Sequence, residues 1–206
     1  MQKRGFLVAI IVAVCAFSVC TAAQAQTELA LSGYGAFTGT TTSNGVSQSP
    51  SNAAGGLFEF QHISNPVLGF EGTYSFNRAN QTYTQNGSVC GLTCGNFSPT
   101  TVSADAHEVT VDWTPSVKIA NFRPFGVLGV GVLLNVPVGS QSNTQTSTKG
   151  LYVYGAGLDW GLLPHLGLRF QYRGNLYKAP DLSKLYTSSN AFAHTSEPVI
   201  GVYFRL

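Results

Sequence analysis

The charged residues of this chain fall on one side of an alternating pattern, and the chemistry they offer is that of ion pairs. Across residues 154–174, one set of alternate positions is bulky and apolar, while the other holds glycines, Asp159 and Arg169. When the other expected strands are divided into alternate positions in the same way, ten charged residues fall on the face that is not bulky and apolar: Glu59, Glu71, Glu108, Asp112, Arg123, Asp159, Arg169, Arg173, Glu197 and Arg205. Buried charges must be paired, because an unpaired one is strongly destabilising. The pattern therefore predicts an internal ion network carried by β-strands.

A second reactive pair is formed by Cys90 and Cys94, in the stretch SVCGLTCGN. In an exported protein, two cysteines this close together indicate a disulfide. A metal site is disfavoured, because no histidine or further cysteine lies near them in the sequence. We expect no bound metal and no cofactor.

The first 25 residues have the features of a signal peptide. Lys3 and Arg4 precede an apolar run, and Ala23 and Ala25 provide a small-residue cleavage site. The run is too short for a comfortable membrane-spanning helix of about 20 residues. We therefore predict a signal peptide over 1–25 and one mature domain over 26–206.

The composition excludes several classes of function. Without Lys3 and Arg4, nine of the eleven basic residues remain against nine acidic ones, so the mature chain has no net charge. No basic patch is present for nucleic acid. Only 10% of residues are charged, where about 25% is usual for a soluble domain. No mature segment is apolar over about 20 residues, so any entry into a membrane must use strands.

Eight strands are expected, most of them close to the 9–11 residues that a tilted transmembrane strand needs. Their expected ranges are 28–38, 53–63, 67–77, 106–114, 122–135, 151–160, 165–174 and 192–206. Short connections around Asn65, Ser116 and Pro164 alternate with long polar ones. This alternation predicts an up-and-down barrel with short periplasmic turns and long external loops.

The two faces of these strands settle which side is inside. An eight-stranded barrel is just wide enough for side chains to fill its interior, so small residues and a few long charged ones must point inward. Bulky apolar residues then point outward, and such a surface is stable only in lipid. We therefore predict an all-β, closed, eight-stranded antiparallel transmembrane barrel.

Hairpin geometry predicts which charges meet, because paired residues in a tight antiparallel hairpin have a constant sum of positions. The turns place three pairs opposite each other: Asp159 and Arg169, Asp112 and Arg123, and Glu59 and Glu71. The two glutamates repel, and neither of their strands has an inward cation. We therefore expect Arg169 or Arg173 to reach across the lumen to Glu59 or Glu71, which would close the lumen with a plug.

The end of the chain, EPVIGVYFRL, resembles the C-terminal signal of outer-membrane barrels through Gly201, Phe204 and Leu206. Residues 26–206 as a whole resemble the small-barrel family of the outer-membrane protein A transmembrane type. The resemblance implies an outer-membrane location and a plugged lumen. It also implies contact with outer-membrane lipid and lipopolysaccharide, and assembly by periplasmic chaperones and the outer-membrane assembly machinery. We expect a monomer, and the sequence names no partner for the loops.

His194 and Ser196 offer the one alternative with catalytic chemistry. Lipid A deacylases of this barrel size use a His-x-Ser pair with a nearby acid, but Glu197 is expected to face the lumen instead. Three functions follow. We favour a non-enzymatic barrel with structural, adhesive or interaction roles, over a narrow porin-like channel and a lipid A-modifying enzyme.

Overall fold

The computed structural model describes residues 25–85, 98–139, 143–186 and 190–206. Over these residues the chain forms ten strands: β1 (Gln26–Thr38), β2 (Thr41–Ser43), β3 (Val46–Pro50), β4 (Ala53–Ile63), β5 (Gly69–Gln85), β6 (Thr100–Trp113), β7 (Phe122–Pro137), β8 (Ser147–Gly161), β9 (Leu166–Lys178) and β10 (Phe192–Arg205). None of the described residues belongs to a helix that is long and apolar enough to cross a membrane.

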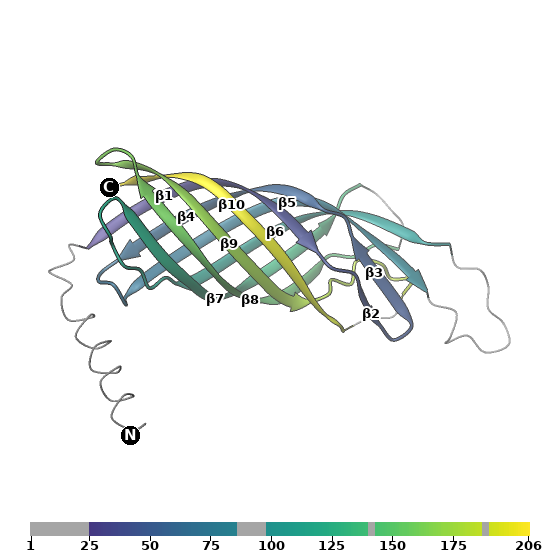
Figure 1. Ribbon diagram of the computed structural model, residues 1–206. Helices are drawn as coiled ribbons and strands as arrows, with labels where there is room; N and C mark the ends of the chain where they lie inside the picture. The colour runs from purple at the N-terminus through teal and green to yellow at the C-terminus, as the bar shows by residue number, and fades with distance from the viewer. Residues whose placement is uncertain (1–24, 86–97, 140–142, 187–189) are drawn as a thin grey trace, which may run out of the picture.

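Eight of these strands close into a barrel (Figure 1). Each of β4 to β10 pairs antiparallel with the next, and β1 closes the cylinder by pairing with β10 on one edge and β4 on the other. The sequence prediction of a closed eight-stranded antiparallel barrel is confirmed. Closure leaves the eight strands without a free edge over most of their length, so their backbone groups are satisfied by one another.

The two ends of the barrel differ, as the alternating connections predict. One end of the barrel carries the start of β1, the end of the chain and three connections: 64–68, 114–121 and 162–165 (Figure 1). We call this the short-turn end and the opposite one the long-loop end. The strands reach further toward the long-loop end than expected: β5 continues to Gln85, and β6 begins at Thr100. Their outward side chains are polar, whereas Tyr83, Val102 and Ala104 point inward, so they lack the outward apolar face by which the membrane-spanning strands are recognised.

A small hairpin at the long-loop end was expected to be loop. β2 and β3 pair through Ser43 and Val46 around the turn Asn44-Gly45, whose φ values are 51° and 74°. Two positive φ angles in a two-residue turn define type I′, for which Asn-Gly is the preferred sequence. β3 then pairs with the outer half of β5. Toward the long-loop end, the hairpin therefore takes the place beside β5 that β4 occupies in the rest of the barrel.

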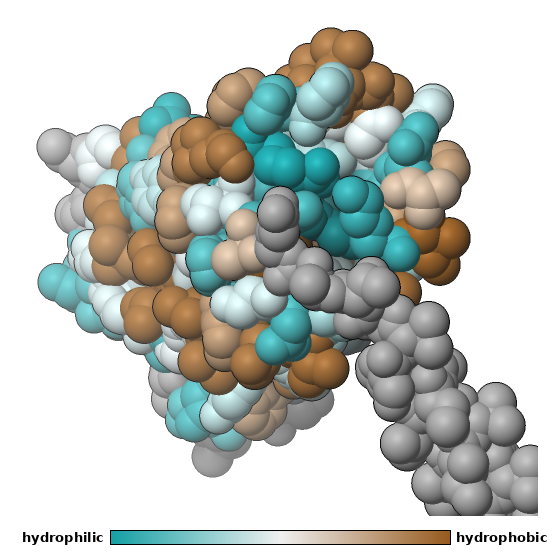
Figure 2. Space-filling view, turned by 90° about the vertical axis from the view of Figure 1, so that its left-hand side faces the viewer, coloured by the Kyte–Doolittle hydropathy of each residue, from teal (hydrophilic) through white to brown (hydrophobic). Residues whose placement is uncertain are grey.

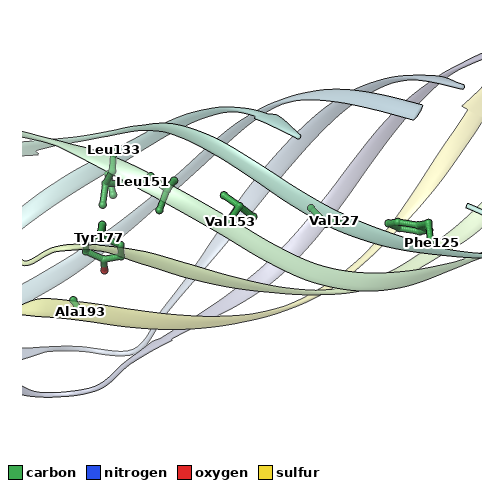
Figure 3. Packing of buried hydrophobic residues seen from close by; sticks show 8 residues of the cluster. Phe125, Val127, Leu133, Leu151, Val153, Tyr177 and Ala193 are labelled. Atoms are coloured by element: carbon green, nitrogen blue, oxygen red, sulfur yellow. The ribbon is translucent and has the colours of Figure 1, made fainter. Parts of the chain in front are cut away.

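The lumen also has an apolar wall, which the sequence analysis did not predict (Figure 3). It gathers inward side chains mainly from β7 and β8: Ala106, Phe125, Val127, Leu133, Leu151, Val153, Tyr177 and Ala193. The expectation that bulky apolar residues all point outward is wrong for these strands. At Phe125 the reason is the inward Gly157, because a Cβ on that glycine would overlap the Phe125 ring.

The outer surface carries the large apolar side chains that the alternation places there. Phe70, Val111, Leu128 and Ile200 are each more than half exposed. Figure 2 looks onto the short-turn end and shows hydrophobic side chains distributed around the barrel's outline, with hydrophilic surface between them. Near this end Phe122 stacks on Trp160, with ring centroids 5.9 Å apart. Aromatic residues of this kind commonly line the edges of the apolar band on transmembrane barrels.

Candidate functional site

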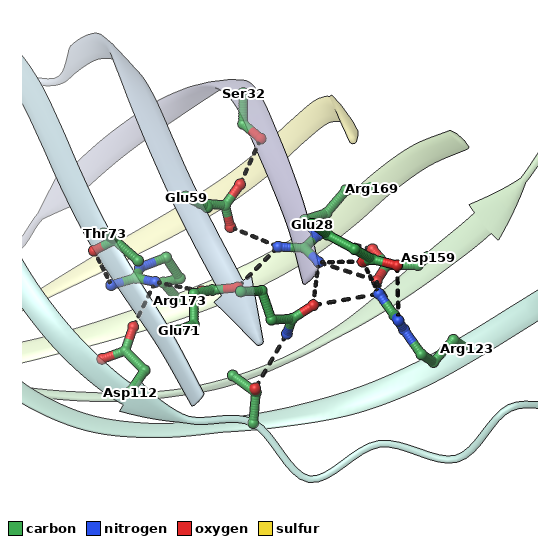
Figure 4. Close-up of polar contacts among 12 residues, drawn as sticks. Glu28, Ser32, Glu59, Glu71, Thr73, Asp112, Arg123, Asp159, Arg169 and Arg173 are labelled. Carbon is green, nitrogen blue, oxygen red and sulfur yellow. Dashed lines mark hydrogen bonds and ion pairs between the residues drawn. The ribbon is translucent and has the colours of Figure 1, made fainter. Parts of the chain in front are cut away.

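The centre of the lumen is organised by Arg169, whose side chain is completely buried (Figure 4). Its Nη1 donates to Glu71 Oε2 at 2.8 Å and to Glu59 Oε1 at 3.3 Å. Its Nε and Nη2 donate to the two oxygens of Asp159 at 2.8 and 3.1 Å. Nη2 also donates to Gln61 Oε1 at 2.8 Å. One guanidinium thus holds carboxylates from β4, β5 and β8, as its planar fork of donors allows.

Two further arginines extend the network toward the short-turn end. Arg123 forms a bidentate ion pair with Glu28 and donates from Nη2 to Asp159 Oδ2 at 2.5 Å. Arg205 donates from Nε to Glu28 Oε1 at 3.0 Å. Glu28 therefore joins β1 to β7 and β10, and Asp159 lies between Arg123 and Arg169. Hydrogen-bonded pairing on both sides is what makes these buried charges tolerable.

Arg173 forms the upper part of the network, toward the long-loop end, and is also completely buried. Its Nη1 donates to Asp112 Oδ2 at 3.0 Å, and its Nη2 donates to Thr110 Oγ1 at 3.2 Å. Two glutamates lie further from its nitrogens, Glu108 at 3.6 Å and Glu71 at 3.7 Å. Arg173 is therefore shared among more carboxylates than it can bind closely.

The contact predicted from the sequence is present, since Arg169 binds both Glu59 and Glu71. One of the three predicted registers is also confirmed, because Asp159 pairs with Arg169 across β8 and β9. Arg123 pairs with the same Asp159 from the other side, across β7 and β8.

The other two predicted registers are wrong. Glu59 lies opposite Thr73, and Glu71 lies opposite Gln61. The turn between β4 and β5 centres on position 66, because the Asn65 side chain accepts hydrogen bonds from the backbone N–H groups of residues 67 and 68 and holds five residues outside the ladder. The centre thus lies one residue later than the sequence suggested, so each partner shifts by two.

Asp112 lies opposite Gly129 and not opposite Arg123. The ladder between β6 and β7 continues as isolated bridges to a tight turn, where Ile119 and Phe122 exchange backbone hydrogen bonds of 2.8 and 2.9 Å. Ala120 takes the positive φ of 54° in this turn. The reversal therefore occurs near the end of the connection, not at its middle. Gly129 provides the space that Asp112 occupies, since a Cβ there would overlap its carboxylate.

Glu28 is the most consequential residue that the sequence analysis missed. It shares the alternating set of Ala30 and Ser32, so its inward direction was readable from the pattern. Neutral polar residues complete the network and carry no such signal. Ser32 donates to Glu59 Oε2 at 2.9 Å, and Gln61 accepts from Arg169 while donating to Thr114 at 3.1 Å.

Residues 179–186, which follow β9, pack against the outer ends of β3, β5 and β6 at the long-loop end. Leu182 is fully buried in an apolar cluster with Val46, Tyr83, Val102 and Ala104. Tyr83 donates from its hydroxyl to the carbonyl of residue 180 at 2.7 Å and accepts from the N–H of Leu182 at 3.0 Å. Lys149 also binds Asp181 at 2.7 Å. We call residues 179–186 the outer cap.

Replacing Tyr83 by phenylalanine is expected to loosen the outer cap. The change leaves the N–H of Leu182 without its partner, which costs about 1–3 kcal/mol for a buried group. It also removes one of the two hydrogen bonds to the carbonyl of residue 180, to which Gln48 Nε2 still donates at 3.1 Å. Trypsin should then cleave after Lys184 at least about tenfold faster in the folded barrel, because cleavage follows the population of the open form. Tyr152→Phe is the matched control, since its ring is 63% exposed on the outer face. Equal cleavage rates in both variants would contradict this role for Tyr83.

The pair with catalytic potential has other partners. His194 and Ser196 both lie on the outer face of β10, where Tyr154 Oη lies 2.8 Å from His194 Nε2 and Tyr172 Oη lies 3.1 Å from Ser196 Oγ. Glu197 points into the lumen and is buried, as the alternation predicts. A serine nucleophile and its histidine base would need to contact each other, and the histidine would need an orienting acid. Here each of the two side chains has a tyrosine hydroxyl as its hydrogen-bond partner instead.

The remaining predicted residues have mixed outcomes. Gly201 lies opposite Ser32 within the barrel wall, while Phe204 and Leu206 are exposed on the outer face at the short-turn end. Their part in assembly stays a prediction. Cys90 and Cys94, and residues 1–24 of the signal peptide predicted over 1–25, lie outside the described residues, so the disulfide and the signal peptide stay predictions. Over the residues that are described, no group of three or more His, Cys, Asp and Glu side chains is arranged to hold a metal ion.

The family of the outer membrane protein beta-barrel domain matches residues 10–197 of this sequence. The chain belongs to this outer-membrane β-barrel family. Its short-turn end is accordingly the periplasmic end, and its long-loop end faces outward. No curated protein matches the sequence in a direct comparison.

Two solved structures show the same fold. One is Ail, the attachment invasion locus protein of Yersinia pestis, solved in complex with the heparin analogue sucrose octasulfate. Ail is 13% identical to this chain, the match covers 89% of this chain and 100% of Ail, and the TM-score is 0.52. The other is Neisserial surface protein A, which is 12% identical over the same shares of the two chains, with a TM-score of 0.56. At these identities the likeness concerns the fold.

Proposed function

We propose that this outer-membrane barrel is a non-enzymatic surface protein with a closed lumen, whose outward extensions serve structural, adhesive or interaction roles. The observation that carries the proposal is the Arg169 network, because it joins β4, β5, β8 and β9 directly across the lumen. A fixed, hydrogen-bonded centre of this kind leaves little room for a water-filled path through eight strands.

The outer end supports the same function. The outer halves of β5 and β6, the β2–β3 hairpin and the outer cap share an apolar cluster of their own around Leu182. They form a folded surface beyond the apolar band, which is where a barrel meets other molecules outside the cell. The outer face of the barrel, with Phe70, Leu128 and Ile200 exposed, fits contact with outer-membrane lipid and lipopolysaccharide. The chain is proposed to act as a monomer that the outer-membrane assembly machinery inserts.

Planar-bilayer recording tests the closed lumen. The purified chain, folded in detergent and added to a bilayer, is expected to give no discrete current steps in 1 M salt. A sixteen-stranded porin added to the same bilayer serves as the positive control, because its lumen is an open aqueous channel. Reproducible steps whose size grows with salt concentration would overturn the closed lumen and favour the narrow channel.

A further inference from the structure

Above Arg173 the lumen contains a small polar cavity of about 40 Å³, which is not filled by the ion network. Its polar lining includes Glu108, Asn135, Asn175 and Glu197, from four different strands. It extends to the rim at the long-loop end, where Thr38 and Ser51 also line it. We call this cavity the outer chamber. Its size suits one water molecule or a small ion.

Several buried polar atoms in the lining of the chamber have no hydrogen-bond partner. Asn175 uses its Nδ2 to donate to Glu108 Oε2 at 3.0 Å. Asn175 Oδ1 and Glu108 Oε1 are then left with no hydrogen-bond partner, although these residues are only 1% and 5% exposed. One buried donor without a hydrogen-bond partner, Asn135 Nδ2, belongs to the same lining. Buried polar atoms are normally satisfied, so two acceptors against one donor indicate that a further donor or a positive group belongs in the cavity.

The charge around the chamber is also unbalanced. Arg173 Nη2 is 3.6 Å from Glu108 Oε1, which is too far for a hydrogen bond, and its closest carboxylate contact is with Asp112 at 3.0 Å. Glu197 is buried, and none of the described arginine and lysine nitrogens comes within 4.0 Å of its carboxylate. Asp112, Glu108 and Glu197 thus have one guanidinium near them, so three negative charges face one positive charge and two remain to be neutralised.

We propose that the outer chamber binds a small monovalent cation, such as Na⁺, between Glu108, Glu197 and the Oδ1 of Asn175. Hard cations take oxygen ligands, and carboxylate and amide oxygens are what this cavity presents. A divalent ion is disfavoured, because the described residues contain no group of three or more His, Cys, Asp and Glu side chains that could hold one. The route from Thr38 and Ser51 leads from outside the cell, so the cation enters without crossing the Arg169 network.

The test compares two salts of equal ionic strength, NaCl and N-methyl-D-glucamine chloride, whose organic cation is far too large for the chamber. The thermal unfolding midpoint of the full barrel in detergent is measured by its change in gel mobility. In Na⁺ at about ten times its dissociation constant, the midpoint should be about 3–5 °C higher than in the organic salt and should saturate with concentration.

Glu197→Gln should abolish the difference between the salts, because it removes charge from the chamber without a large change in volume. Asp105→Asn is the matched control, since Asp105 lies on the outer face in a pair with Arg78, and it should keep the difference. If Glu197→Gln does not assemble, Glu108→Gln takes its place. Equal midpoints in both salts for the unaltered chain would overturn the proposal, since water or protons would then satisfy the chamber. A difference that persists in the glutamine variant would also overturn it.

Discussion

Arg169→Ala is expected to lower the free energy of unfolding by about 3–5 kcal/mol, which is the usual cost of removing one partner from a buried ion pair. The variant leaves Glu59, Glu71 and Asp159 without the guanidinium that contacts all three. Urea titration of the barrel folded in lipid vesicles measures the change. Fluorescence reports the transition, because the chain has two tryptophans and Trp113 and Trp160 both lie on the outer face.

Two companion variants separate charge from geometry. Arg169→Lys keeps the positive charge but cannot bridge several carboxylates with a planar fork, so its stability should fall between those of the unaltered chain and the alanine variant. Arg78→Ala removes an arginine from an exposed pair with Asp105 at the outer rim and should leave the unfolding midpoint unchanged. An Arg169→Ala barrel as stable as the Arg78→Ala barrel would show that the network contributes nothing to stability.

The direction of the charged side chains on the strands was predictable from the sequence, because alternation reports directly on which face is buried. Arg169, Arg173 and Glu59 were assigned to the lumen on this basis, and all three are fully or almost fully buried there. The pattern holds as long as one face meets lipid. It fails at the outer ends of β5 and β6, where the outward side chains are polar and the apolar ones, Tyr83, Val102 and Ala104, point inward.

The register of the strands was harder to predict, because it depends on where each turn reverses. The turn at Leu163 and Leu166 is close to its expected centre, so the pairing of Asp159 with Arg169 followed. The other two turns are displaced by features that periodicity does not report, the Asn65 side chain in one case and the late reversal at Ala120 in the other. The cross-lumen contact was nevertheless found, because a long arginine can reach past an error of one or two residues.

The contact between the Arg169 guanidinium and the Phe125 ring was not predictable from the sequence, since it depends on Gly157 facing that ring. The guanidinium carbon of Arg169 lies 5.0 Å from the centre of the Phe125 ring, which is 4% exposed. Gly157, opposite Phe125 on β8, has no side chain, and a Cβ there would overlap the ring. The ring therefore occupies the space that this glycine leaves and supports the guanidinium from below.

This arrangement predicts that the effect of Gly157→Ala on the free energy of unfolding changes sign when Phe125 is also replaced by alanine. Phe125→Ala should destabilise the barrel by about 3–5 kcal/mol, as loss of a buried ring does. Gly157→Ala alone should destabilise it by about 1–3 kcal/mol, because Arg169 prevents the ring from moving away from the new methyl group. In the Phe125→Ala background the same methyl group enters vacated space, so Gly157→Ala should there be neutral or stabilising.

The four barrels of this cycle are compared by urea unfolding in the same vesicles. A coupling free energy of about 1–3 kcal/mol between the two sites is expected, well beyond the additivity seen for independent positions. Gly150→Ala provides the control, because a Cβ at that outward glycine meets no atom within 4 Å, and its effect should be the same with or without Phe125. If the effects of Phe125→Ala and Gly157→Ala simply add, the ring and the glycine do not share one space, and Arg169 must be held by its carboxylates alone.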